Sequence, residues 1–334
     1  MSLVSAARGF DEVAGRLPAH LTTRLRLPVI AAPMLHVSGP ELVVAACAAG
    51  VIGAFPTANA RSVAELDEWL FAIEEAAAGV AEPVAPYAAN LIVRRPRTVE
   101  DLEILARHRV EIVITSVGSP SALVGPLHEA GTLVLCDVAT LRHAHRAVEA
   151  GVDGLVLLTA GSGGQTGWMN PLAFVRAVRQ FYAGPLVLAG GIGDGRTLLA
   201  AQVLGCDLGY LGTAFIATEE SMAAPEYKRM LVQSSLDDVV LTSAFTGLPT
   251  SMLAPALRAA GIEPDELDEN ITPAQAAERY GARGGGDNPK RWVDLWSAGH
   301  SVSGVREVPR AAELVNRLAS EYDAARAQLL GGSS

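Results

Sequence analysis

Three short apolar runs between residues 154 and 213 are each followed by glycines. Each run is long enough for a strand buried on both faces, and helical periodicity separates the runs. The glycines are Gly161, Gly163, Gly164 and Gly167, then Gly190, Gly191, Gly193 and Gly195, and finally Gly212. Parallel α/β folds bind ligands at the carboxyl ends of their strands, which is where these glycines lie. We therefore expect a binding site rather than tight turns alone, and free N–H groups at a helix N-terminus there predict a phosphate.

The same strand and helix unit recurs along most of the chain. The predicted strands are Pro28–Ala32, Val51–Phe55, Pro86–Val93, Glu111–Thr115, Thr132–Cys136, Gly154–Leu158, Pro185–Ala189 and Leu208–Gly212. Repetition of one βα unit eight times, about every 20 to 35 residues, predicts an α/β fold, the closed TIM (β/α)8 barrel. A doubly wound sheet is the alternative, but the glycine runs lack the third glycine of a dinucleotide fingerprint.

The pattern changes after residue 218. Helical pieces follow over Pro225–Val232, Ser251–Ala260 and Pro273–Tyr280, separated by turn residues. We expect a small helical insertion after the eighth strand, joined to the ligand end of the barrel and able to act as a lid. The predicted organisation is an amino-terminal segment (1–27), the barrel (28–218), the insertion (219–290) and a return to the barrel with a carboxy-terminal helix (291–330).

Charge and cysteine usage exclude several classes of function. The net charge is −10, from 26 basic and 36 acidic residues without a basic run, so nucleic acid and anionic membranes are not expected partners. The longest nearly unbroken apolar run, Leu42–Phe55, is too short to span a bilayer. Cys47, Cys136 and Cys206 form no CxxC pair, which indicates neither a disulfide framework nor a metal site and favours a cytoplasmic protein.

Six short motifs occur in register along the chain. They are AAPM after the first strand, YAANL around Asn90, GSGGQTG after the sixth strand, AGGIGDGR after the seventh, GT at Gly212 and Thr213, and WSAGH near the end. Together they resemble the nitronate monooxygenase family, formerly called 2-nitropropane dioxygenases, and its relatives the flavin-type enoyl-acyl carrier protein reductases. The resemblance covers residues 25–328 and implies a TIM barrel that binds FMN at the carboxyl ends of its strands.

The resemblance also implies which residues contact the cofactor. They are Ala32, Pro33, Met34, Asn90, Asp137, Gly163, Gly164, Gln165, Gly190, Gly191, Gly212 and Thr213. Among them, the implied phosphate cradle consists of Gly190, Gly191, Gly212 and Thr213. The AAPM backbone is implied to face the isoalloxazine ring, Asn90 to hydrogen-bond to it, and the glycines of GSGGQTG to let the backbone approach it.

Gln165 is a first departure from the family pattern. Well-known members carry a histidine at this position, and that histidine is the proposed base or proton donor. An amide donates and accepts hydrogen bonds but takes no proton near neutral pH. If a base is present, His36 in the first βα loop and His300 in WSAGH are the candidates, so Gln165, His36 and His300 are the predicted catalytic positions.

Asp137 is a second departure, because some relatives place a lysine there, near the flavin. A carboxylate at this position would oppose an anionic reduced flavin if it were close and ionised.

The predicted function is therefore an FMN-dependent oxidoreductase that oxidises small alkyl nitronates with O2. A nitronate is already deprotonated, so Gln165 is compatible with this reaction. The alternative is an NAD(P)H-dependent FMN reductase of enoyl thioesters or quinones, although no residues identify a nicotinamide site. A flavin-binding protein with little turnover is a third hypothesis. A homodimer is compatible with such an enzyme, but the sequence shows no distinct interface.

Overall fold

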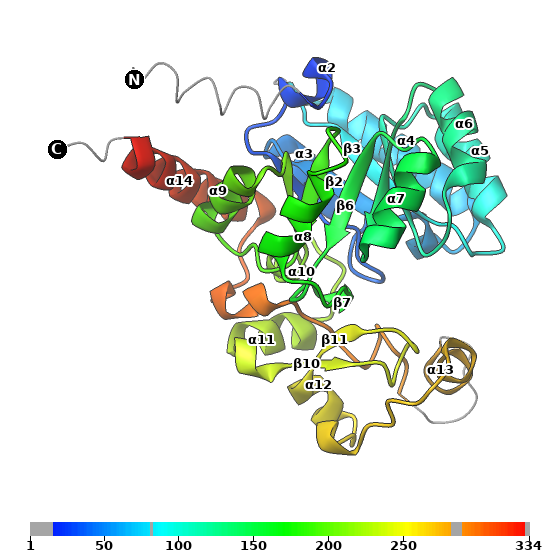
Figure 1. Ribbon diagram of the computed structural model, residues 1–334, viewed down its shortest axis with the longest axis vertical. Coiled ribbons are helices and arrows are strands. Elements are labelled where there is room, and N and C mark those ends of the chain that lie inside the picture. The colour runs from blue at the N-terminus through cyan, green and yellow to red at the C-terminus, as the bar shows by residue number, and fades with distance from the viewer. Residues whose placement is uncertain (1–15, 81–82, 282–288, 331–334) are drawn as a thin grey trace.

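The computed structural model describes residues 16–80, 83–281 and 289–330. Eight parallel strands form a closed barrel in chain order, and the last strand pairs with the first. They are β1 (Val29–Ala31), β2 (Ile52–Pro56), β3 (Tyr87–Ile92), β4 (Ile112–Ser116), β5 (Leu133–Val138), β6 (Gly154–Leu158), β8 (Leu186–Ala189) and β9 (Leu208–Leu211). The predicted TIM barrel is confirmed (Figure 1).

Helices surround the barrel. They are α3 (Pro40–Ala48), α4 (Val63–Ala78), α5 (Thr98–Arg107), α6 (Ser121–Glu129), α7 (Leu141–Glu149), α8 (Pro171–Val178), α9 (Gly195–Leu204) and the carboxy-terminal α14 (Ala311–Leu330). Helix α14 packs against both α9 and α3, and so covers the gap between the last and first βα units. The contact needs Gly195, because a Cβ there would lie 2.1 Å from the backbone nitrogen of Tyr322.

Side chains of each barrel strand alternate between the interior of the barrel and the surrounding helices, as the two-residue period of a strand requires. The interior cluster includes Ile30, Ile112, Leu135, Val187 and Leu208. The outward residues pack with the helices into a separate, larger cluster. The interior is therefore apolar through its lower layers, and its polar side chains are confined to the carboxyl ends of the strands.

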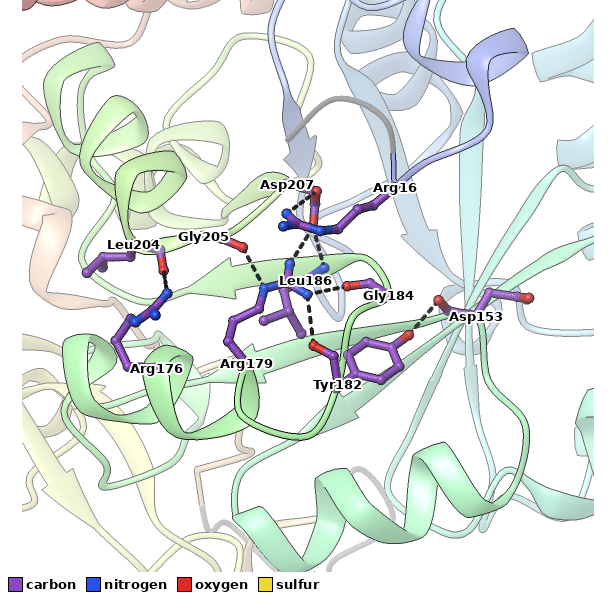
Figure 2. A network of polar contacts seen from close by, with 10 residues as sticks. All are labelled: Arg16, Asp153, Arg176, Arg179, Tyr182, Gly184, Leu186, Leu204, Gly205 and Asp207. Carbon is purple, nitrogen blue, oxygen red and sulfur yellow. Dashed lines mark hydrogen bonds and ion pairs between the residues drawn. The ribbon is translucent and has the colours of Figure 1, made fainter. Parts of the chain in front are cut away.

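A buried ion pair closes the amino-terminal end of the barrel (Figure 2). The carboxylate of Asp207, only 1% exposed, accepts hydrogen bonds from Arg179 at 2.8 Å and from Arg16 at 3.3 Å. It also accepts one from the backbone N–H of Leu186 at 2.8 Å. Arg179 donates in addition to three backbone carbonyls, those of Tyr182, Gly184 and Gly205. The network joins the amino-terminal segment, the turn after α8 and the starts of β8 and β9.

Residues 219–281 lie beyond the carboxyl ends of the strands (Figure 1). They contain α11 (Pro225–Gln233), η2 (Leu236–Asp238), β10 (Val239–Thr242), β11 (Thr250–Leu253), α12 (Ala254–Ala259), η3 (Pro264–Glu266) and α13 (Pro273–Tyr280). Strand β11 pairs antiparallel with β10 and with β7 (Gly164–Gln165) in the loop after β6. The helix predicted from Ser251 is therefore wrong in its first three residues, and it begins at Ala254.

Shorter elements complete the described chain. They are α2 (Ala19–Thr22), η1 (Thr57–Asn59), α10 (Thr213–Ile216) and η4 (His300–Gly304). Of the predicted amino-terminal segment 1–27, residues 1–15 lie outside the described residues. Among the described helices, none has both the length and the apolar character that crossing a bilayer requires.

Candidate active site

A cavity of about 940 Å³ lies at the carboxyl ends of the barrel strands. Its wall includes the loops after β1, β6 and β8 and the segment around Trp296 that precedes η4. All twelve positions that the resemblance implied as cofactor contacts lie in this lining. The volume is in the range of small-molecule and cofactor sites, so the carboxyl end of the barrel is a candidate active site.

The three predicted catalytic residues occupy different places. Gln165 lies in the cavity lining, whereas His36 and His300 do not. His36 is exposed, with a left-handed φ of 60° and its N–H bonded to Asn59 Oδ1 at 2.9 Å. Although His36 is exposed, partial loss of hydration around its ring and then the charge of Arg95 lower the pKa of His36. His300 is also exposed, and its ring lies against the backbone of Gly161.

The loop that carries Gln165 is fixed from two directions. Gln165 pairs with Thr250 of β11, and Gly164 pairs with Ser251. The N–H of Gly164 donates to Ser297 Oγ at 2.6 Å. The insertion and the return segment therefore both hold this loop, which keeps Gln165 in the cavity wall.

The N-terminus of α9 is closed by carboxylates. Asp194 accepts a hydrogen bond from the N–H of Thr197 at 2.7 Å, in a capping box. The N–H of Gly195 donates to Glu321 of α14 at 3.0 Å. A phosphate is therefore not expected at the N-terminus of α9, because the N–H groups of Gly195 and Thr197 are bonded to carboxylates.

Free backbone donors lie instead in the turns just after β8 and β9. Within the described part of the chain, the N–H groups of Gly191, Ile192, Gly212 and Thr213 donate no hydrogen bond. Gly191 has φ of 76°, and a Cβ added to it would meet no atom within 4 Å. Three of the four donors belong to residues of the implied phosphate cradle, and all four residues line the cavity.

Two predicted contacts are already engaged within the fold. The amide nitrogen of Asn90 donates to the carbonyl of Ile114 at 2.9 Å and to Ser116 Oγ at 3.1 Å. The N–H of Met34 donates to Ser38 Oγ at 3.0 Å. Asn90 therefore has its carbonyl oxygen, rather than its amide nitrogen, as the group with capacity for a ligand.

Asp137 lies at the end of β5 with an unusual carboxyl group. Its Oδ1 is buried and has no hydrogen-bond partner in the described chain, and burial raises the pKa of Asp137 to about 7. The expected repulsion between an ionised Asp137 and an anionic reduced flavin is therefore reduced, because the carboxyl holds its proton up to about neutral pH.

Sequence reasoning missed Tyr210, whose side chain faces the barrel interior from β9 and lines the cavity. Its hydroxyl is also buried without a partner. Its position two residues before Gly212, on the inward-facing register of an apolar strand, is the signal that was available. Also missed were basic side chains in the lining, namely Arg94, His143, Arg146 and Arg291.

Comparison with known proteins gives related enzymes. A model of the family described as nitronate monooxygenase matches residues 75–321. The chain is 29% identical over 229 residues to (3aS,4S,5R,7aS)-5-hydroxy-7a-methyl-1-oxo-octahydro-1H-indene-4-carboxyl-CoA dehydrogenase of Mycobacterium tuberculosis, covering 68% of this chain and 62% of that protein. It is 28% identical over 345 residues to nitronate monooxygenase of Paraburkholderia phytofirmans, covering 90% and 94%. The structure of FabK from Thermotoga maritima superposes with a TM-score of 0.79 at 25% identity, covering 95% and 99%.

Proposed function

Because the chain belongs to the nitronate monooxygenase family, we propose that it is an FMN-dependent enzyme that oxidises alkyl nitronates with O2. Family membership makes it an oxidoreductase, and the cofactor and substrate are our proposal. The observation that carries it is the set of free N–H groups after β8 and β9, at one edge of a cavity of about 940 Å³.

The residues present fit a flavin mononucleotide. Four unbonded N–H groups from Gly191, Ile192, Gly212 and Thr213 supply the donors that a phosphate needs. The open space beside Gly191 leaves that approach unobstructed. The rest of the wall is mainly apolar, and Ala32 and Met34 supply surface for a flat ring. Bound FMN would supply the electron acceptor for the nitronate.

Gln165 suits a substrate that needs no base. Its amide offers one donor group and one acceptor to a ligand, but no site for a proton at neutral pH. Neither His36 nor His300 lines the cavity, so no histidine from the predicted set is available to remove the α-proton of a neutral nitroalkane. We therefore expect turnover of ethyl nitronate and little turnover of nitroethane.

The test is anaerobic bleaching of the flavin. The protein is purified, its flavin is confirmed by the visible spectrum, and ethyl nitronate, nitroethane, NADH or NADPH is added without oxygen. Bleaching by ethyl nitronate alone is the expected result. Equal bleaching by nitroethane would contradict the role given to Gln165, and a protein without flavin would contradict the cofactor.

A second candidate is an NAD(P)H-dependent reductase of enoyl thioesters or quinones. It is favoured by similarity to a protein named as a carboxyl-CoA dehydrogenase and by exposed Arg94 and Arg146 in the cavity wall. Guanidinium groups suit the phosphates of a coenzyme A thioester. Bleaching by NADH or NADPH and not by the nitronate would favour this function over the first.

A further inference from the structure

Four polar side chains form the uppermost layer of the barrel interior. They are Asn90 of β3, Ser116 of β4, Asp137 of β5 and Tyr210 of β9, and all four line the cavity. The inward residues one step below Asp137 and Tyr210 are Leu135 and Leu208, both in the apolar interior cluster. The polar layer is therefore the floor of the cavity and stands directly on an apolar core.

Asn90 and Ser116 are satisfied by each other and by strand β4. By contrast, Asp137 Oδ1 and the Tyr210 hydroxyl are two of only four buried side-chain polar atoms in the described residues that lack a partner. Leaving buried polar atoms unbonded is costly, so such atoms need an explanation. Here two of them lie in the floor of one cavity.

The two oxygens of Asp137 have different surroundings. Oδ1 is closed off, whereas Oδ2 makes no hydrogen bond within the described chain and is not among the closed-off atoms. Oδ2 is therefore the oxygen open to the cavity. Tyr210 lies close enough that the Asp137 charge is a cause, after burial, of its raised pKa. The Tyr210 hydroxyl is thus a neighbour of this carboxyl in the cavity floor, without a hydrogen bond to Oδ1.

The electrostatic surroundings keep a proton on Asp137. Burial is the cause that raises its pKa, and it is the sole carboxyl in the described lining of the cavity. In register with Asp137 the neighbouring strands present Ser116 of β4 and Val156 of β6, neither of which is ionisable. The other ionisable groups of the lining are Arg94, Cys136, His143, Arg146, Tyr210, Tyr227 and Arg291. A neutral carboxyl donates a hydrogen bond, which a carboxylate cannot do.

We propose that Asp137 is a carboxylic-acid donor in the cavity floor, with Oδ2–H bonded to an electron-rich oxygen of the ligand. Oδ1 is closed off from the cavity, so Oδ2 is the oxygen that carries the proton toward the ligand. This inference rests on the proposed function, because the acceptor is either a carbonyl of the flavin ring or an oxygen of the nitronate. Both sources share the same chemistry, an electron-rich oxygen on a planar conjugated system that accepts a hydrogen bond.

Flavin binding tests whether the acceptor is a carbonyl of the flavin ring. FMN is titrated into flavin-free protein between pH 6 and 8.5, and quenching of its fluorescence gives the affinity. Between pH 6 and 8.5 the FMN affinity of the wild type is expected to fall roughly thirtyfold relative to that of Asp137→Asn. The reason is that a group with a pKa of about 7 is mostly protonated at pH 6 and about 3% protonated at pH 8.5. Asp137→Asn keeps a donor and has no such pH dependence. Asp137→Leu has no donor and binds about tenfold or more weakly at pH 6.

Tyr210→Phe tests whether burial alone keeps the proton on Asp137. The Tyr210 hydroxyl makes no hydrogen bond to the carboxyl, and burial is the cause of the raised pKa of Asp137. Removing the hydroxyl is therefore expected to leave the pH midpoint of ligand affinity at the wild-type value. A midpoint that moves in Tyr210→Phe would contradict burial as the cause that keeps the carboxyl neutral.

Nitrate binding tests whether the acceptor is an oxygen of the nitronate, because nitrate is a planar oxyanion of similar shape. If FMN affinity is the same in the wild type and the Asp137 variants, nitrate binding to the flavin-loaded protein is followed by the visible spectrum. Nitrate affinity that falls with pH in the wild type and not in Asp137→Asn places the acceptor on the substrate. If neither FMN nor nitrate affinity depends on Asp137, the proposal is wrong.

A flavin-free arm separates this inference from the proposed function. Between about pH 4 and 7 the unfolded Asp137 is ionised while the folded group, with a pKa of about 7, retains its proton. The folded state therefore binds more protons, and stability falls as the pH rises through this range. We expect this fall in the wild type and not in Asp137→Asn, measured by urea unfolding. Failure of the protein to bind FMN would count against the proposed function alone, whereas parallel profiles would overturn the neutral carboxyl.

Discussion

Gly191 and Gly131 have similar backbone conformations at opposite ends of the barrel. Their φ angles are 76° and 84°, and a Cβ at either would meet no atom within 4 Å. Alanine at either position is expected to cost about 1–2 kcal/mol from the left-handed backbone alone. Gly191 lines the cavity, whereas Gly131 precedes β5 at its amino end. The two variants therefore differ in what they do to a ligand and not in strain.

We predict that Gly191→Ala weakens FMN binding about tenfold or more, because its methyl group occupies the space beside the free N–H groups. Gly131→Ala is expected to match it in urea unfolding and to keep wild-type FMN affinity. Fluorescence quenching measures the affinity. Equal affinities in the two variants would mean that the turn after β8 does not hold the phosphate.

At the scale of elements, the insertion and the Gln165 loop form one unit. Strand β11 pairs with β7, and Ser297 Oγ accepts the N–H of Gly164 at 2.6 Å. A lid that moved freely over the cavity would have to break this pairing. The predicted lid is therefore better described as a clamp on the loop, and motion of the insertion is expected to move Gln165 with it.

Ser297→Ala tests that clamp. Loss of the hydroxyl leaves the Gly164 N–H without its acceptor, at a cost of about 1 kcal/mol. We expect faster hydrogen exchange in residues 161–167 and a raised KM for ethyl nitronate. Ser303→Ala is the matched control, because Ser303 Oγ also accepts a backbone N–H, that of Leu236 at 2.8 Å, but outside this loop. The clamp is disproved if both variants exchange alike over residues 161–167.

The local elements could be predicted because their signals are local. Each barrel strand is an apolar run bounded by turn residues, so the predicted strand boundaries fall within two residues of the structure. The pairing of Gln165 with Thr250 joins residues far apart in sequence, and no periodicity marks a two-residue strand. The composition from Ser251 onward likewise predicted a helix where β11 lies, because pairing with β10 and β7 decides the conformation of this segment.

The candidate site was predictable as a set of positions and less so as chemistry. Glycine placement and motif order located the cavity, but the closure of α9 by Glu321 depends on a helix far along the chain. From the sequence alone, the side chain of Asp137 is expected to be ionised. Its burial in the fold is what raises the pKa of the carboxyl, so that it keeps its proton near neutral pH. Tyr210 gave no chemical signal, because an aromatic residue in a strand is ordinary core.

At the scale of the whole molecule, the two ends of the barrel have separate tasks. The carboxyl end carries the cavity and its unbonded polar atoms. The amino end is sealed by the Asp207 network, in which Arg179 and Arg16 meet one carboxylate (Figure 2). The network ties the amino-terminal segment to β8 and β9. In TIM barrels this end contributes stability rather than catalysis, and the separation of tasks can be tested by removing one charge.

Asp207→Asn is predicted to lower the free energy of unfolding by about 3–5 kcal/mol, because it leaves the Arg179 guanidinium, 8% exposed, without its counter-charge. FMN affinity of the folded variant is expected to stay at the wild-type value, since the network lies at the other end of the barrel. Arg258→Met is the control. It breaks a pair with Glu263 whose side chains are 56% and 62% exposed, and such a pair contributes about 1 kcal/mol or less. Urea unfolding separates the two, and an Asp207→Asn protein as stable as Arg258→Met would show that the amino-terminal end is held by packing alone.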